Sequence, residues 1–183
     1  MATPMAYLAL ACKAALAVVL LAAGGAKLAD LPGFAATVRL FLRASAPPLA
    51  RRAVAFSIAA AEIAAGAASL SSPGAGWLNL AVLALCAGFL LVSALGYLRF
   101  PGRACQCFGA LSGRSFSVAA IGRAALITTM AVLALTPVSA SLISLGAAGR
   151  LGLLAGAGLI AWCAWTAAAA IGTGRDARQG LAS

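Results

Sequence analysis

The sequence predicts an all-α fold, a polytopic membrane helix bundle with about five transmembrane helices and one interfacial helix. Of its 183 residues, 64% are hydrophobic and only 9% are charged, whereas a soluble domain carries about a quarter charged residues. Five apolar runs reach the length of about 20 residues that a helix needs to cross a bilayer. They cover residues 5–25, 53–70, 77–98, 118–137 and 151–173. Because the connectors are short, we expect one membrane domain over residues 1–183.

The charge pattern indicates a membrane setting rather than a nucleic-acid partner. Thirteen Lys and Arg face three acidic residues, for a net charge of +10. Most of the basic residues lie in connectors beside apolar runs, where they contact membrane lipid and set topology. The first run lacks a preceding basic segment and contains Lys13, so we expect an uncleaved transmembrane helix. The absence of His excludes imidazole metal sites and His acid–base catalysis.

The connector 26–52 predicts a short interfacial helix. Asp30 is a suitable N-cap for a helix that begins near Leu31 and Pro32. Pro47 disfavours helix at the residue before it and so sets the end of the segment. Apolar residues recur at helical spacing along this segment, namely Phe34, Val38, Phe41 and Leu42. Two interpretations remain open, an amphipathic linker and a lid over a site between the helices.

Charged residues inside the apolar runs predict a buried pair. With about 1.5 Å of rise per residue, Lys13 and Glu62 both fall near the middle of the bilayer. Unpaired charges at that depth are costly, so such residues pair or line a polar cavity. We therefore expect Lys13 to pair with Glu62, with Arg123 as the competing partner. The pair would either fix helix packing or handle protons.

The five cysteines fall into two groups. Three lie singly inside apolar runs, where free Cys acts as a small apolar residue: Cys12, Cys86 and Cys163. Cys105 and Cys107 lie two residues apart in the connector 99–117, between Arg103 and Arg114. Nearby arginines and the start of a helix favour the reactive thiolate, which indicates a redox dithiol. A second interpretation is a metal site, which would need about four ligands. The third is incidental exposure of two thiols.

Several elements resemble the MauE family of methylamine-utilisation membrane proteins, which are akin to DoxX. More remotely, that family resembles vitamin K epoxide reductase and the DsbB-type disulfide generators. The Cys-x-Cys-Phe-Gly element at residues 105–109 is the specific part of the match. The others, in chain order, are Gly-Ala-Lys-Leu-Ala-Asp at 25–30, Pro-Gly-Phe at 32–34, Glu-Ile-Ala-Ala-Gly at 62–66 and Ile-Gly-Arg at 121–123.

The resemblance implies that Cys105 and Cys107 exchange disulfides with a thioredoxin-like periplasmic partner similar to MauD. The client would be the small (β) subunit of methylamine dehydrogenase. Lys27, Glu62 and Arg123 match framework positions, and the remoter relatives imply a membrane quinone as electron acceptor. The chain departs from the epoxide reductases because residues 26–52 contain no second cysteine pair. A partner must therefore meet the 105–107 pair directly.

Two opposing arguments predict the orientation of the protein in the membrane. Ten basic residues lie on the side of the dithiol, namely Lys27, Arg39, Arg43, Arg51, Arg52, Arg99, Arg103, Arg114, Arg175 and Arg178. The positive-inside rule would place them in the cytoplasm. A periplasmic client requires the opposite, so we expect the dithiol outside the bacterial cytoplasmic membrane. Two other functional hypotheses stay open, a DoxX-like quinone-linked oxidoreductase subunit for a small sulfur compound and a transporter or assembly factor without redox chemistry.

Overall fold

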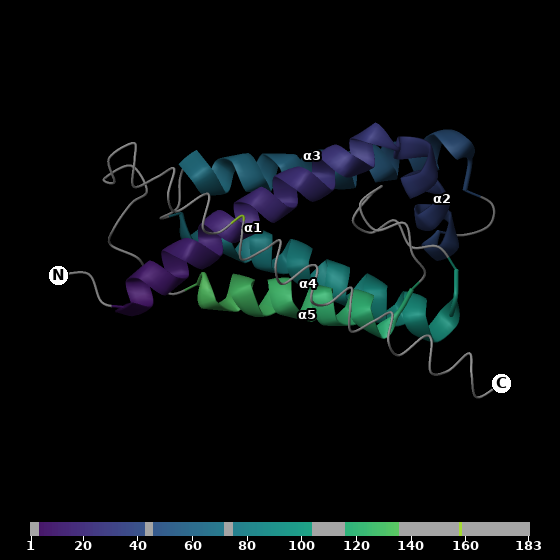
Figure 1. The fold of residues 1–183 in the computed structure, drawn as a ribbon. Coiled ribbons are helices and arrows are strands. Elements are labelled where there is room, and N and C mark those ends of the chain that lie inside the picture. The colour runs from purple at the N-terminus through teal and green to yellow at the C-terminus, as the bar shows by residue number, and fades with distance from the viewer. Residues whose placement is uncertain (1–3, 43–45, 72–74, 104–115, 136–157, 159–183) are drawn as a thin grey trace, which may run out of the picture.

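The computed structural model describes residues 4–42, 46–71, 75–103, 116–135 and 158. These residues form only helices, in the order α1 (Pro4–Ala29), α2 (Leu31–Phe41), α3 (Pro48–Ser71), α4 (Gly76–Arg99) and α5 (Val118–Leu133). Figure 1 shows the four longer helices running lengthwise beside one another, with α2 at one end of the bundle. The helical membrane bundle predicted from the sequence is confirmed.

Among the described residues, three helices are long and apolar enough to cross a membrane, over Ala9–Ala29, Pro48–Ser71 and Gly76–Arg99. The fourth apolar run of the sequence forms α5, a shorter apolar helix of 16 residues. The fifth, 151–173, lies outside the described residues apart from Gly158. Both α1 and α3 extend beyond the apolar runs that predicted them. At the start of α3, Pro48 has no N–H to leave unsatisfied, so the first helical turn accommodates it.

Close packing between α1 and α3 sets their antiparallel register. A Cβ atom on Gly24 would lie 2.7 Å from Ile63 Cγ1 and 2.9 Å from the Ala59 carbonyl oxygen. A Cβ atom on Gly66 would lie 2.9 Å from Leu21 Cγ. Glycines at such positions let two membrane helices approach closely. Residue 24 of α1 is therefore level with residues 59–63 of α3, a register that determines which charged residues can meet.

The short helix α2 packs its inner face on α3. The Asp30 carboxylate caps it by accepting a hydrogen bond from the Gly33 N–H at 3.1 Å, as the sequence predicted. Phe34 and Val38 are buried against Ala55 and Ile58 of α3. The helix ends at Phe41, with Leu42 in extended backbone as its C-cap. It thus stops several residues before Pro47, and the expectation that this proline ends it is wrong.

Exposed aromatic residues near the two ends of α4 fit the two membrane–water interfaces. Trp77 near its start is 72% exposed and Tyr97 near its end is 37% exposed. Their separation of twenty residues corresponds to about 30 Å of helix, the thickness of the hydrocarbon core. Trp and Tyr side chains concentrate at membrane–water interfaces. We therefore expect the end of the bundle that carries α2 to lie at one membrane surface.

Candidate functional site

A buried ion pair lies at the centre of the helix packing. Lys27, in the last turn of α1, donates a hydrogen bond from Nζ to Oε1 of Glu62 on α3, and both side chains are 0% exposed. The ammonium group also lies 5.2 Å from the ring centroid of Phe34 on α2 and 4.6 Å from that of Phe89 on α4. Aromatic faces attract such a cation where water is excluded. One lysine thus connects four helices.

The pairing differs from the one that the sequence predicted. Lys13 is buried, but it precedes Lys27 by 14 residues, which is about 21 Å along α1. Since residue 24 is level with residues 59–63 and the two helices are antiparallel, Lys13 lies level with the C-terminal end of α3, whereas Glu62 lies in the middle of that helix. The prediction measured depth from the ends of the apolar runs, and both helices extend past those ends. Arg123 is buried on α5, but the side chain that pairs with Glu62 is that of Lys27.

Two buried polar atoms on α3 and α4 have no hydrogen-bond partner among the described residues. Glu62 Oε2 and Ser93 Oγ are both buried and accept or donate no hydrogen bond among the described residues. Ser93 follows Phe89 by one turn of α4, and Cys86 precedes Phe89 by one turn. Cys86 and Ser93 therefore share the face of α4 on which Phe89 meets Lys27.

The two cysteines within the described residues have a structural role. Cys12 and Cys86 are free and buried, so their predicted place in the helix packing is confirmed. The Thr128 hydroxyl of α5 lies 3.1 Å from the Cys86 carbonyl oxygen and 2.8 Å from that of Ala124. This contact connects α5 to α4 beside the buried thiol. Cys163 lies outside the described residues.

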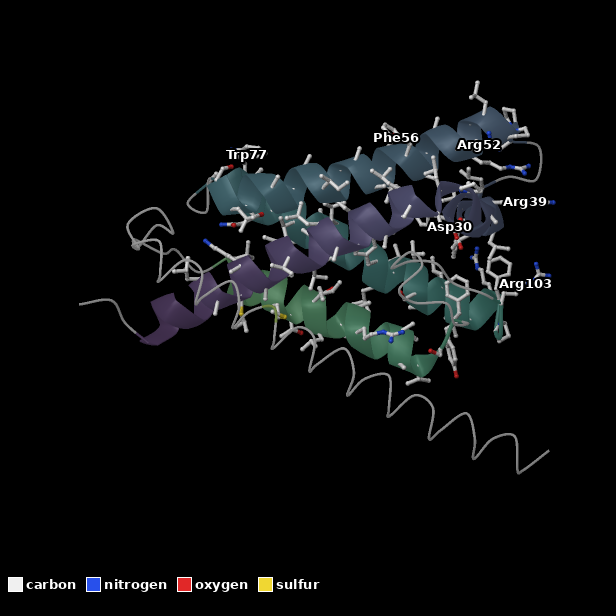
Figure 2. The ribbon with its side chains drawn as sticks, turned by 45° about the horizontal axis from the view of Figure 1, so that its top comes forward. Asp30, Arg39, Arg52, Phe56, Trp77 and Arg103 are labelled. Atoms are coloured by element: carbon white, nitrogen blue, oxygen red, sulfur yellow. The ribbon has the colours of Figure 1, made fainter. Side chains whose placement is uncertain are left out.

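Exposed arginines surround the end of the bundle that carries α2. Figure 2 labels Arg39, Arg52 and Arg103 at that end, with Trp77 at the other. Arg99 is also exposed there, in the last turn of α4. The Lys27–Glu62 pair lies below this surface. Because Phe89 precedes Tyr97 by eight residues, Lys27 is about 12 Å deeper than the Tyr97 boundary.

The segment that holds Cys105, Cys107 and Arg114 lies outside the described residues, but both of its ends are described. The Phe116 N–H donates to the Arg103 carbonyl oxygen at 3.0 Å, and the Arg103 N–H donates to that of Phe100 at 3.2 Å. The two residues that flank 104–115, Arg103 and Phe116, therefore lie next to each other. Ser117 then caps α5 by accepting a hydrogen bond from the Ala120 N–H at 3.3 Å.

Sequence reasoning did not single out Phe89, Ser93 or Thr128. Cys86, Phe89 and Ser93 recur at spacings of three and four residues, the spacing of one helix face. The sequence did offer one signal, because Ser93 is a polar residue on that face, in a helix without charge in its middle. Lys27 was named only as a framework position, although it lies one turn after Gly24 on α1.

The fold and the buried ion pair define a polytopic helical membrane protein with a charged group inside its bundle. Residues 5–137 match the family model for the methylamine utilisation protein MauE. That match covers well over half of the chain, and the chain belongs to this family. Neither the curated proteins nor the solved structures contain a match to it. A role in methylamine utilisation follows from the family.

Proposed function

We propose that this protein is a membrane thiol–disulfide redox factor that helps to mature the small (β) subunit of methylamine dehydrogenase. In this proposal, Cys105 and Cys107 form the redox pair and a thioredoxin-like protein is the direct partner. The membrane is the cytoplasmic membrane of a bacterium, and the pair faces the periplasm. Membership of the methylamine utilisation family supports the pathway. The position of the cysteine segment supports the chemistry.

The observation that carries the proposal is the joined base of the segment 104–115. Arg103 and Phe116 are hydrogen-bonded to each other at the end of the bundle that carries α2. Arg103 lies beyond Tyr97 and beyond the end of α4 at Arg99. A soluble partner can approach a segment with its base at the membrane surface, whereas thiols inside the bundle are out of its reach. Cys12 and Cys86 are of the second kind.

Charge near the base favours the reactive form of the thiols. Arg99 and Arg103 are exposed at the end of α4, and Arg114 lies within the segment itself. Positive charges favour thiolate over thiol, and the thiolate is the attacking species in disulfide exchange. The start of α5 adds the positive end of a helix dipole just after the segment.

The proposed reaction transfers two electrons by disulfide exchange. The thiolate of one cysteine attacks a sulfur of the partner's disulfide, which forms a mixed disulfide and releases one partner thiolate. The thiolate of the second cysteine then attacks the mixed disulfide. The partner leaves as a dithiol, and a disulfide joins Cys105 to Cys107. The reverse steps oxidise the partner with the same balance of atoms and electrons.

The buried residues act as framework in this proposal. Lys27 and Glu62 hold α1, α2, α3 and α4 together through the ion pair and its aromatic neighbours. Lys13 and Arg123 are buried elsewhere along α1 and α5. None of these four residues is at the surface that a soluble partner would meet.

Serine substitutions test the proposal. Cys105→Ser and Cys107→Ser should each abolish maturation of the dehydrogenase small subunit in cells, because either change removes one half of the exchange. The matched controls are Cys12→Ala and Cys86→Ala, which remove thiols buried in the bundle, with protein abundance measured for every variant. Full maturation in a Cys105→Ser/Cys107→Ser double variant would favour an assembly factor without redox chemistry.

A further inference from the structure

Four exposed arginines lie at the end of the bundle that carries α2, and we call them the arginine rim. Arg39 is in the last turn of α2 and Arg99 is in the last turn of α4. Arg52 lies near the start of α3, and Arg103 lies just beyond the end of α4. Figure 2 shows Arg39, Arg52 and Arg103 at this end of the molecule. Three helices therefore contribute to one basic surface.

Contacts between these helices hold the arginine rim together. Helix α2 packs its buried face on α3, and Ala55 in that contact follows Arg52 by three residues. The Phe41 ring of α2 lies 5.8 Å from that of Phe100, at an interplanar angle of 88°. This edge-to-face arrangement is one at which aromatic rings attract each other. Because Phe100 directly follows Arg99, the same contacts that join α2 to α3 and α4 bring the arginines to one end.

The described residues contain two acidic side chains against the four positive charges of the arginine rim. Glu62 pairs with Lys27 inside the bundle. Asp30 lies at the start of α2, where its carboxylate accepts a hydrogen bond from the Gly33 N–H at 3.1 Å. One aspartate cannot balance four arginines, so the rim keeps a net positive charge among the described residues. Such a surface attracts anions.

Large apolar side chains face outward beside the arginines. On α3, Leu49 is 78% exposed and Phe56 is 53% exposed. With Arg52 between them, they follow one helix face at spacings of three and four residues. On α4, Leu98 is 74% exposed and directly precedes Arg99. Exposed apolar surface of this kind indicates contact with a membrane or a protein partner.

The combination of arginine and leucine selects between these two occupants. A guanidinium group donates two parallel hydrogen bonds to the oxygens of a phosphate, and leucine side chains pack against acyl chains. Leu49 precedes Arg52 and therefore lies farther toward the end of the bundle than this arginine. A soluble acidic protein would match the charges but would leave the outermost leucine in water. A phospholipid matches both groups.

We propose that the arginine rim binds the phosphate groups of anionic phospholipids, with Leu49, Phe56 and Leu98 against their acyl chains. This proposal goes beyond the redox function and does not depend on it. Its consequence is a preference for lipids whose headgroups carry a net negative charge. Zwitterionic lipids offer the same acyl chains, but their second charge offsets that of the phosphate.

Lipid titrations of the full chain in detergent test the proposal. Native mass spectrometry would measure the Kd for phosphatidylglycerol and for phosphatidylcholine with identical acyl chains. The unsubstituted protein should bind phosphatidylglycerol more tightly. Arg39→Gln and Arg52→Gln should each weaken that binding about fivefold, with little change for phosphatidylcholine. Arg52→Lys keeps the charge and should retain most of the preference.

Leu80→Ala is the matched control, because Leu80 is an exposed residue near the other end of α4. It should leave the preference for phosphatidylglycerol unchanged, and thermal unfolding would show that each variant is folded. Equal affinity of the unsubstituted protein for the two lipids would overturn the proposal. So would an unchanged preference in a folded Arg39→Gln/Arg52→Gln double variant.

Two soluble anions distinguish a lipid from other sources of negative charge. Glycerol phosphate carries the headgroup chemistry without acyl chains, and a poly-glutamate peptide stands for an acidic protein. Each should compete with phosphatidylglycerol only weakly, because neither contacts the exposed leucines. Competition as strong as that of phosphatidylglycerol itself would contradict a lipid site. With glycerol phosphate it would indicate a site for free phosphate, and with poly-glutamate a docking surface for an acidic protein.

Discussion

Lys27 and Glu62 meet beside the close contact of α1 with α3 at Gly24, one turn after this glycine on α1. Both side chains are fully buried, and Glu62 uses one carboxylate oxygen for the contact while the other has no partner among the described residues. The lysine also lies against rings from α2 and α4. The pair therefore determines how four helices meet beneath the surface that the cysteine segment adjoins.

Removing one member of this pair should destabilise the protein more than removing both. Glu62→Ala leaves the Lys27 charge buried alone, and breaking a buried pair in this way costs about 3–5 kcal/mol. A Lys27→Met/Glu62→Met double variant removes both charges and should recover most of the loss. Thermal unfolding in detergent measures the difference. A double variant as unstable as the sum of the single changes would contradict a direct pair.

Neighbouring glycines on α1 give a matched test of the helix packing. Gly24→Ala would place a methyl group 2.9 Å from the backbone oxygen of Ala59, which cannot move without shifting α3. We expect a loss of about 1–3 kcal/mol. Gly25→Ala meets nothing within 4 Å and should be neutral. Equal stability of the two variants in thermal unfolding would show that the register described here is wrong.

The seat of Phe116 on α4 can be tested in the same way. Gly96→Ala would bring a methyl group 2.0 Å from the Phe116 ring, whereas Gly88→Ala on the same helix has open space. Gly96→Ala should displace the ring and lower the unfolding temperature, and Gly88→Ala should not. Gly96→Ala should also alter the maleimide reactivity of Cys105, because Phe116 directly follows the segment 104–115 that contains this cysteine. Unaltered reactivity and stability in Gly96→Ala would mean that Phe116 is not fixed there.

The sequence predicted the helices well because their signal is local. Apolar runs of sufficient length predicted three spans and α5, and the Asp30 cap was recognised from its neighbours. The ion pair was mispredicted because partner choice depends on register between helices. Register is set by contacts such as Gly24 with Ile63, which no single apolar run reveals. The contacts of Phe41 depend on the same three-dimensional arrangement.

Orientation in the membrane is open to a direct labelling test. A membrane-impermeant maleimide applied to intact spheroplasts after mild reduction should label Cys105 and Cys107, because a periplasmic client requires them outside. A Cys105→Ser/Cys107→Ser/Cys163→Ala variant is the control and should stay unlabelled, since its two remaining cysteines, Cys12 and Cys86, are buried. Labelling only after lysis would place the pair in the cytoplasm. The basic end of the bundle would then follow the positive-inside rule.

The redox state of Cys105 and Cys107 in cells tests the central claim most directly. Cells would be quenched with acid, and the thiols and disulfides of these two residues quantified by alkylation and mass spectrometry, with and without the thioredoxin-like partner. The proposed exchange predicts that the fraction of the 105–107 disulfide changes when the partner is absent, because one route of electron transfer is lost. An identical redox state in both strains, together with full maturation of the client in the Cys105→Ser/Cys107→Ser variant, would contradict a redox function for this protein.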